Sequence, residues 1–460
     1  MAERFSQFLD NICAQSTLGK LLLPMIFLFI IILSVIFLQG GIGNVQLVVI
    51  IAAIFAFYMA INIGANDVAN NMGPAVWSKA ITIWWAILLA WIFEAAGAII
   101  AGGDVVNTIK WGIIDSSYIP DTGIFIAIML ATLFGSAVWI NIATYTKSPV
   151  SATHSVIGGL LWAGTMALGV SVIHWEKIGQ IVASWVISPV LWWTIAAWLL
   201  WSIDTTIIKR ESRHDAAQKW VPIYVSLMSG SFATYLLLKG LKEIIHVEML
   251  TAFLFGIAVA LWTYLLVKRL LIKYSGLFKN SKKSINKLFN LPLVFSAALL
   301  SFAHGANDVA NAIGPFAAIY ETATTQTIWS SAGIPIWIMI IGAIGLALGL
   351  GIYGSTLIKT VGNEITKLNQ IRAYCVALSA AVTVIIASAL GLPVSSTHIA
   401  IGWIFGIWFF REWQKKRMGE TKTYIDKSLL KQIVLSWIIT LPASAFIAGI
   451  SFTSIIYFVG

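Results

Sequence analysis

Apolar runs of about 20 residues recur along the whole 460-residue chain and contain almost no charged side chains. This is the length that an α-helix needs to cross a hydrocarbon core of about 30 Å while satisfying its own backbone polar groups. Charged residues make up 10% of the chain, far below the roughly 25% of a soluble domain. We therefore predict an all-α polytopic membrane protein. The runs fall near 21–38, 46–65, 83–101, 124–143, 149–170, 178–201, 221–238, 249–267, 291–306, 335–353, 371–391, 393–410 and 429–458.

Basic residues gather in the polar loops 202–220, 268–287 and 411–428. If every apolar run crosses the membrane, these loops share one side, which the positive-inside rule identifies as the cytoplasm. We therefore expect a multi-pass protein of the plasma membrane, embedded in the lipid bilayer, with its N-terminus in the cytoplasm and its C-terminus outside. The net charge of +10 then reflects orientation in the membrane, and no nucleic-acid partner is expected.

Two further features concern cross-linking and processing. Cys13 and Cys375 lie far apart and lack the spacing of a zinc site or of a disulfide framework. The first apolar run, 21–38, follows Lys20 and has no small-residue cleavage motif at its end. This pattern favours an extra, uncleaved N-terminal anchor over a signal peptide.

Three sequence patterns occur twice and in the same order, which indicates an internal duplication. The pairs are "GANDVANNMGPA" at 64–75 with "GANDVANAIGPF" at 305–316, "SPVSATHSVIG" at 148–158 with "LPVSSTHIAIG" at 392–402, and "IVASWVISP" at 181–189 with "IVLSWIITLP" at 433–442. From the second apolar run to the ninth the count advances by seven, so the copies enter the membrane in opposite orientations. A re-entrant 149–170 run would change this parity. Inverted repeats are a transporter architecture, with sites near the midplane where the repeats meet.

The predicted architecture is therefore about 12–13 transmembrane segments in two inverted-topology repeats, with broken helices at the midplane. We divide the chain into an N-terminal region with the extra anchor (1–45), a first repeat (46–220), linking helices with a basic cytoplasmic loop (221–290) and a second repeat (291–460).

The first repeated motif, GAND, places an acid and amides inside an apolar run. The candidate Na⁺ ligands are Asn66, Asp67 and Asn70 in the first copy and Asn307, Asp308 and Asn311 in the second. The flanking glycine and proline residues weaken or break a helix, and freed carbonyls, amides and carboxylates are oxygen ligands that suit Na⁺. Helix-packing asparagines would explain a single copy. An aspartate, however, costs at least about 2.5 kcal/mol in the membrane core, and here it occurs twice.

The second repeated motif, PVSxTH, offers donors for an oxyanion. Ser148 followed by Pro149 is typical of an N-cap and a first helical residue, and the amides of a helix N-terminus bind anions. The candidate anion-binding hydroxyls are Ser151, Thr153, Ser395, Ser396 and Thr397. Hydrogen bonds from these hydroxyls to helix carbonyls are the alternative. His154 and His398 remain open between packing, proton-sensitive gating and a direct ligand role.

Charge connects the two motifs. A phosphate dianion beside Asp67 and Asp308 would be repelled by about 4 kcal/mol per pair of unit charges at 4 Å with an effective dielectric of 20. Cations must therefore lie between the anion and the aspartates, so each ligand improves the site of the other. Glu94 is the only other acid deep in an early run and is a third candidate site for a cation or a proton.

Both motif pairs, with "KWGIID" at 110–115, "GSAVW" at 135–139 and "PIW" at 335–337, resemble the inorganic phosphate transporter (PiT) family over roughly residues 46–458. The resemblance implies secondary active uptake of inorganic phosphate by a homodimer, driven by Na⁺ in many members and by H⁺ in others, without an organic cofactor. GANDVAN in both halves looks more like the sodium-coupled branch. Some relatives in that branch carry further glutamates before PVSxTH, whereas 124–134 and 373–391 contain no acid, so their ion stoichiometry is not carried over.

Other function classes fit the sequence less well, and no enzymatic activity is expected. A hydrolase built from Ser151, His154 and Asp67 would need one specialised base rather than two symmetric copies. A passive anion channel could use helix ends and hydroxyls, but buried aspartates count against an anion pathway. An H⁺-coupled phosphate or metal-phosphate permease and a sulfate permease remain open, because phosphate and sulfate are both tetrahedral dianions.

Overall fold

The structure is a computed structural model that describes residues 44–146, 150–240, 247–328, 333–364, 368–398 and 427–459. Within these ranges the chain is almost entirely helical, and its one β-contact is an isolated antiparallel bridge between Ile114 and Ile173. Ten helices of this part are long and apolar enough to cross a membrane. The predicted all-α polytopic fold class is confirmed. The expected anchor at 21–38, most of the run 393–410 and most of the basic loop 411–428 lie outside the described residues.

The described ranges contain the following helices. In chain order they are α3 (Asn44–Trp77), α4 (Ile83–Ala101), α5 (Gly103–Trp111), α6 (Thr122–Tyr145), α7 (Ala152–Leu168), α8 (Trp175–Ile203), α9 (Arg213–Tyr235), α10 (Met249–Lys273), α11 (Lys282–Leu288), α12 (Asn290–Thr325), α13 (Ile336–Glu364), α14 (Gln370–Ala389) and α16 (Lys427–Val459). Short 3-10 or π segments are η1 (Ser116–Tyr118), η2 (Val170–Val172), η3 (Asp204–Ile208), η4 (Leu236–Gly240) and η5 (Ser275–Leu277).

Helix α12 forms the centre of the bundle. It packs against α3, α4, α14 and α5, and every residue from Ser296 to Ile319 is buried. A helix that is buried on all faces belongs to a core rather than to a surface. Polar residues within this stretch of α12 are therefore shielded from both solvent and lipid.

Helices α3 and α12 run in opposite directions. Beyond the end of α3, the Ser78 carbonyl accepts a hydrogen bond from Gln370 Nε2 at 3.0 Å. Just before the start of α12, Phe289 packs edge-on against Tyr374, with ring centroids 5.4 Å apart. Gln370 and Tyr374 lie in the first turns of α14, so α3 ends near the place where α12 begins. Two inverted copies require this antiparallel arrangement.

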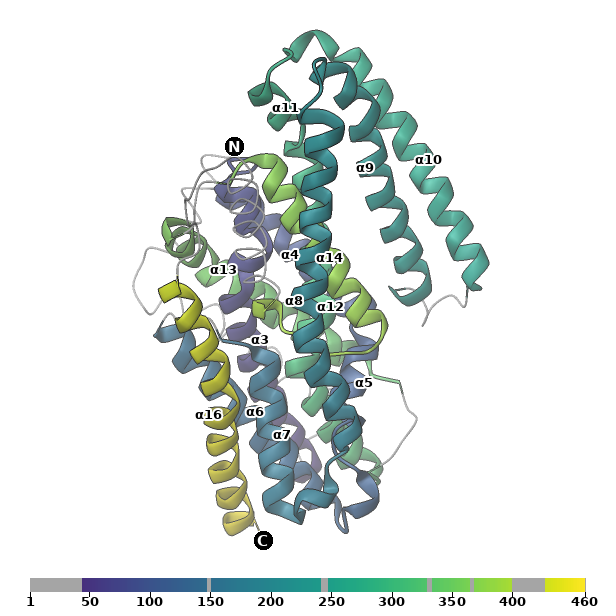
Figure 1. Ribbon diagram of the computed structural model, residues 1–460. Helices are drawn as coiled ribbons and strands as arrows, with labels where there is room; N and C mark the ends of the chain where they lie inside the picture. Colours follow the sequence, from purple (N-terminus) through teal and green to yellow (C-terminus); the bar gives the residue numbers. More distant parts are fainter. Residues whose placement is uncertain are drawn as a thin grey trace.

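Helices α6 and α7 form a hairpin that enters and leaves the bundle at the same end (Figure 1). Phe55 packs on Phe134 with ring centroids 5.1 Å apart, and Asn141 Nδ2 donates to Asn62 Oδ1 at 3.0 Å, so α6 runs alongside α3 in the same direction. The chain then turns at Val150 and returns as α7, which packs against α6. The runs 124–143 and 149–170 therefore lie antiparallel to each other. Because both arms of the hairpin return to one end, the odd number of crossings between the two GAND runs is unchanged.

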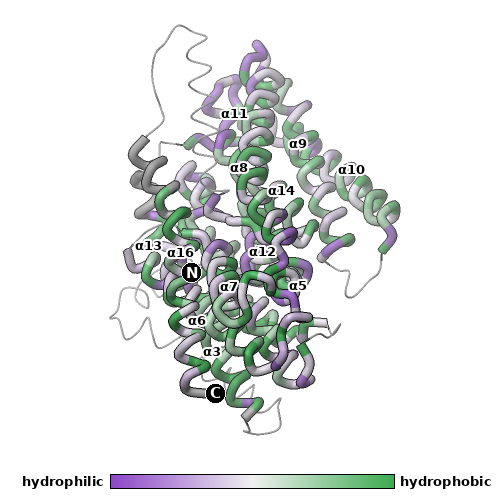
Figure 2. Tube along the Cα trace, turned by 60° about the horizontal axis from the view of Figure 1, so that its bottom comes forward, coloured by the Kyte–Doolittle hydropathy of each residue, from purple (hydrophilic) through white to green (hydrophobic). Residues whose placement is uncertain are grey.

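Helices α9 and α10 pack mainly on each other, beside the bundle (Figure 1). At one end of this pair, Asn280 Nδ2 donates to the Glu211 carbonyl at 3.0 Å, and the Arg213 amide donates to Asn280 Oδ1 at 2.9 Å. The loops 202–220 and 268–287 thus lie together, and Figure 2 shows hydrophilic residues gathered there, around α11. The C-terminus lies at the opposite end (Figure 1). This arrangement agrees with the predicted topology, while the side of the membrane stays a prediction.

Candidate functional site

Both GAND motifs lie on continuous helices. α3 and α12 pass through the motifs without interruption and contain Pro74 and Pro315 inside the helix, so the predicted helix breaks at these motifs are wrong. The motif glycines instead allow close packing. A Cβ on Gly64 would lie 2.0 Å from the Leu346 carbonyl oxygen, and one on Gly305 would lie 2.1 Å from the Glu94 carbonyl oxygen. The glycines therefore bring the backbones of neighbouring helices together, and the candidate ligands near them are side chains.

The two GAND carboxylates are fully buried and hydrogen bonded from several elements. Asp67 is 0% exposed and Asp308 is 1% exposed. Asp67 Oδ1 accepts from Asn70 Nδ2 at 2.9 Å and from Asn66 Nδ2 at 3.4 Å. Asp308 Oδ2 accepts from the Ser396 hydroxyl at 2.8 Å. Each carboxylate is thus oriented by neutral donors, a setting that holds an anionic side chain ready for a cation.

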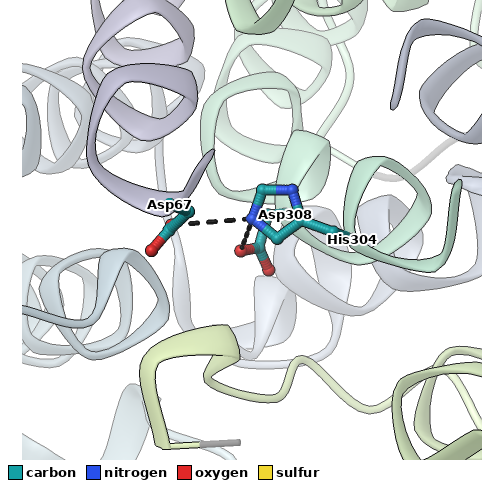
Figure 3. A group of neighbouring side chains, drawn as sticks. All are labelled: Asp67, His304 and Asp308. Carbon is teal, nitrogen blue, oxygen red and sulfur yellow. Dashed lines mark ion pairs between the residues drawn. The ribbon is translucent and has the colours of Figure 1, made fainter. Parts of the chain in front are cut away.

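A histidine that the sequence analysis did not select joins the two aspartates. His304 Nε2 lies 2.8 Å from Asp308 Oδ2 and 3.6 Å from Asp67 Oδ2, and Figure 3 shows its ring pointing between the two carboxylates. His304 precedes the second GAND motif directly, but the matching residue in the first copy is Ile63. Comparison of the two repeats therefore passed over it. The available signal was a histidine inside a largely apolar run.

Glu94, a candidate accessory residue, lies on the other side of the same histidine. Its Oε1 is 3.3 Å from His304 Nδ1 and accepts a hydrogen bond from Asn71 Nδ2 at 2.6 Å. Glu94 is 0% exposed and Asn71 is 1% exposed. Asn71 and Glu94 come from the first half of the chain and His304 from the second. This line of contacts links α3, α4 and α12.

The start of α7 differs from the prediction. The helix begins at Ala152, and Ser151 is its N-cap, with Ser151 Oγ accepting from the His154 amide at 3.2 Å. The expected cap, Ser148, and the expected first helical residue, Pro149, lie outside the described residues. The later start has a physical reason, because a serine hydroxyl bonded to the amide three residues ahead satisfies an end amide. In the second copy Ser395 Oγ accepts from the His398 amide, also at 3.2 Å.

The motif threonines exchange hydrogen bonds between the two copies. Thr153 Oγ1 donates to the Val394 carbonyl at 3.1 Å, and Thr397 Oγ1 donates to the Val150 carbonyl at 2.9 Å. Thr397 Oγ1 also lies 3.4 Å from Asp67 Oδ1. The tip of the α6–α7 hairpin and the segment that follows α14 therefore touch, and each supplies the acceptor for the threonine of the other.

The second-copy asparagines hold these tips against α12. Asn307 Nδ2 donates to the Leu392 carbonyl at 3.2 Å, and Asn307 Oδ1 accepts from the Val394 amide at 3.2 Å. Asn311 Nδ2 donates to Thr153 Oγ1 at 3.3 Å. In the first copy, Asn66 Nδ2 donates to the Val150 carbonyl at 3.1 Å. The amides thus connect the GAND helices to the PVSxTH segments.

His154 and His398 lie side by side at this junction, with ring centroids 4.5 Å apart. His154 also packs against Trp185 at 3.9 Å between ring centroids, and Trp185 Nε1 donates to the Pro393 carbonyl at 3.3 Å. Trp185 lies in the third repeated pattern, which the sequence analysis used only as evidence of duplication. The candidate residues of both motifs thus meet in one cluster of carboxylates, amides and hydroxyls, which is buried except for the half-buried Asn66, Asn70 and Ser396.

Comparisons with known proteins agree on one family. A family model for the phosphate transporter family matches residues 63–448. A Helicobacter pylori (strain J99 / ATCC 700824) protein named "Putative phosphate permease" is 50% identical over 397 residues, covering 85% of this chain and 74% of that protein. A Haemophilus influenzae protein of the same name is 37% identical over 409 residues, covering 87% and 95%. A solved structure described as "The sodium-dependent phosphate transporter" matches with a TM-score of 0.82 and 33% identity, over 88% of this chain and 98% of that one.

Proposed function

The chain belongs to the phosphate transporter family, and we propose that it imports inorganic phosphate across the plasma membrane by symport with Na⁺. The observation that carries this proposal is the contact between the two motifs. Thr397 Oγ1 lies 3.4 Å from Asp67 Oδ1, and Ser396 Oγ lies 2.8 Å from Asp308 Oδ2. Groups suited to a cation and groups suited to an anion therefore share one buried cluster.

The charge in this cluster favours coupling to a cation. Within the described chain, the side-chain contacts of the Asp67 and Asp308 carboxylates are with asparagine, serine, threonine and histidine, and none is with lysine or arginine. A phosphate dianion at 4 Å would be repelled by about 4 kcal/mol per pair of unit charges at an effective dielectric of 20. Na⁺ between the carboxylates and the anion removes this repulsion. Binding of either ligand then strengthens binding of the other.

The proposed roles follow the chemistry of the side chains. Na⁺ takes oxygen ligands from the GAND residues Asn66, Asp67, Asn70, Asn307, Asp308 and Asn311. Phosphate takes donors from the PVSxTH hydroxyls Ser151, Thr153, Ser395, Ser396 and Thr397. The Thr153 and Thr397 hydroxyls, which now donate to backbone carbonyls of the opposite tip, would turn to the anion. Neutral donors suit this task because phosphate can leave them again during transport.

Support for Na⁺ in particular comes from the solved relative, a protein named as sodium-dependent. Coupling to H⁺ instead of Na⁺ is the alternative, because His304 contacts three buried carboxylates at the proposed Na⁺ site.

We also propose a homodimer, following the family resemblance, with a cytoplasmic N-terminus, following the basic loops. Light scattering of the purified protein and protease access to the loop 202–220 in sealed vesicles test these two assignments.

Uptake of radiolabelled phosphate into proteoliposomes tests the proposed function. We expect accumulation when an inward Na⁺ gradient is imposed at equal pH, little accumulation with a pH gradient alone, and weak competition by sulfate. Asp67→Asn and Asp308→Asn should each abolish the Na⁺-driven component. Asp204→Asn is the control, because Asp204 pairs with Lys209 at 2.9 Å near the basic loop, away from the cluster. Accumulation driven only by the pH gradient would assign H⁺ as the coupling ion, and equilibration without any gradient would indicate a channel.

A further inference from the structure

Three different side chains direct ligand atoms at one point between α3 and α12. One oxygen from Asp67, one ring nitrogen from His304 and one oxygen from Asp308 all lie within 4.8 Å of one another. All three residues are at most 1% exposed, and Figure 3 shows the imidazole between the two carboxylates. Atoms bound to one metal ion at about 2.0–2.2 Å must lie within such a distance of one another.

Each carboxylate has one oxygen without a hydrogen-bond partner. Asp67 Oδ1 accepts from Asn70, whereas Asp67 Oδ2 is buried and has no hydrogen-bond partner. Asp308 Oδ2 accepts from Ser396, whereas Asp308 Oδ1 is buried without a hydrogen-bond partner. A buried carboxylate oxygen with no donor is costly. At Asp67 the unpartnered oxygen, Oδ2, is the one that lies 3.6 Å from His304 Nε2, so a cation bound there would remove this cost.

The contacts of His304 resemble those of metal-binding histidines, in which the ring nitrogen that does not bind the metal often contacts a carboxylate. Its Nε2 faces the two aspartates, and its Nδ1 lies 3.3 Å from Glu94 Oε1. A carboxylate on the second ring nitrogen fixes the tautomer and orientation of the ring and makes the first nitrogen a better ligand. Glu94 is itself fixed by Asn71 Nδ2 at 2.6 Å. This arrangement is costly to bury if the histidine serves only for packing.

The ligand types distinguish between classes of ion. Na⁺, Mg²⁺ and Ca²⁺ favour oxygen ligands alone, whereas imidazole suits first-row transition metals such as zinc and cobalt. Three buried carboxylates surround the histidine, so a divalent ion offsets more of the local negative charge than a monovalent ion. We propose that Asp67, His304 and Asp308 bind a divalent first-row transition-metal ion, and that Glu94 positions the imidazole for it. The ion shares two aspartates with the proposed Na⁺ site and adds a nitrogen ligand that Na⁺ does not need.

Cobalt binding to the purified full-length protein tests this proposal without any transport measurement. Untagged protein in a sodium-free choline buffer is titrated with Co²⁺, followed by visible absorption and calorimetry. We expect one Co²⁺ per chain, and X-ray absorption should report one imidazole together with oxygen ligands. Added NaCl should weaken Co²⁺ binding relative to choline chloride at equal ionic strength, because the two ions compete for Asp67 and Asp308.

Two variants and a matched control identify the ligands. Glu94→Gln should weaken Co²⁺ binding by about 10- to 100-fold, the usual effect of losing an outer partner of a metal-bound histidine. His304→Gln should weaken it further still. His174→Gln is the control, because His174 is a partly exposed histidine near Asp115, beyond the far end of the 17-residue helix α7, whose start lies in the cluster. Unchanged Co²⁺ affinity in folded His304→Gln would overturn the proposal, as would an X-ray absorption spectrum of the unaltered protein without an imidazole ligand.

These outcomes are separable from those of the proposed function. If uptake proves to be driven by protons while Co²⁺ binds through His304, the symport proposal fails and the metal site stands. If uptake follows the Na⁺ gradient while Co²⁺ binding does not depend on His304, the symport proposal stands and the metal site fails. Should His304→Gln not fold, the absorption spectrum and the competition by Na⁺ in the unaltered protein still decide the question.

Discussion

Replacement of Thr397 by valine separates substrate binding from structural support. Valine keeps the shape of threonine and removes the hydroxyl that donates to the Val150 carbonyl at 2.9 Å. That carbonyl also accepts from Asn66 Nδ2 at 3.1 Å, so it keeps a donor in the variant. Thr397 Oγ1 also lies 3.4 Å from Asp67 Oδ1, but this oxygen keeps the closer Asn70 Nδ2 donor at 2.9 Å. The structural cost of Thr397→Val is therefore mainly the loss of the hydrogen bond to Val150, about 0.5–1.5 kcal/mol.

The expected loss of phosphate-binding free energy is larger than this structural cost. If the hydroxyl turns to the anion, its removal loses a hydrogen bond to a charged group, about 1.5–3 kcal/mol. That free energy corresponds to a roughly 10- to 150-fold weaker affinity. The apparent phosphate constant of uptake should rise by this factor, while Na⁺ affinity measured without phosphate should change little. Thermal unfolding in detergent measures the structural cost on the same preparation.

Thr383→Val is the matched control. Thr383 is buried like Thr397, but its hydroxyl donates to the Ser379 carbonyl on its own helix at 2.9 Å. It should lower stability slightly and leave the phosphate constant unchanged. Equal phosphate constants in folded Thr397→Val and Thr383→Val would refute the assignment of Thr397 to the anion. A loss of Na⁺ affinity with phosphate affinity retained would show that the two motifs have been assigned the wrong way round.

The remaining predictions concern packing and a second buried charge pair. Gly305→Ala should destabilise the protein by about 1–3 kcal/mol in thermal unfolding, because the added Cβ would lie 2.1 Å from the Glu94 carbonyl oxygen. Gly179→Ala is the control and should not destabilise it, because no atom lies within 4 Å of the added Cβ. Lys110→Met should destabilise by about 3–5 kcal/mol, because it leaves Glu321, its ion-pair partner at the α5–α12 contact, buried without a cation. Adding Glu321→Leu to Lys110→Met should recover much of the loss, and a double variant less stable than Lys110→Met would contradict this account.

Much of the architecture could be predicted from the sequence because apolar length and low charge leave few alternatives. The all-helical fold follows from the cost of unsatisfied backbone groups in lipid. The helix breaks predicted at the GAND motifs are wrong, because glycine also allows neighbouring helices to pack closely and does not by itself indicate a break. The carbonyls of Leu346 and Glu94 that approach Gly64 and Gly305 come from helices distant in the sequence. The order of residues along one chain does not show which distant helices pack together.

Repetition both revealed and concealed the site. The matched positions of Asp67 and Asp308 made them candidates, and the structure brings them to one histidine. His304 itself has no counterpart, since Ile63 takes its place in the first copy, and Asn71 is matched by Ala312. Comparison of the copies selects what they share, so it passes over residues that make them different. The contacts between Asn71, Glu94 and His304 therefore needed three-dimensional information.

The crossed bonds between the hairpin tips also bear on how such a chain could have originated. Thr153 finds its acceptor on Val394 and Thr397 finds its acceptor on Val150, so each copy carries a donor whose acceptor belongs to the other. If the two copies descend from one ancestral segment, that segment could not have formed these crossed hydrogen bonds within a single polypeptide. It would have had to assemble with a second identical chain lying in the opposite orientation, and fusion of the two genes would have made that pairing permanent. After such a fusion the copies can diverge, which allows a histidine in one copy to contact a glutamate in the other, as His304 and Glu94 do here.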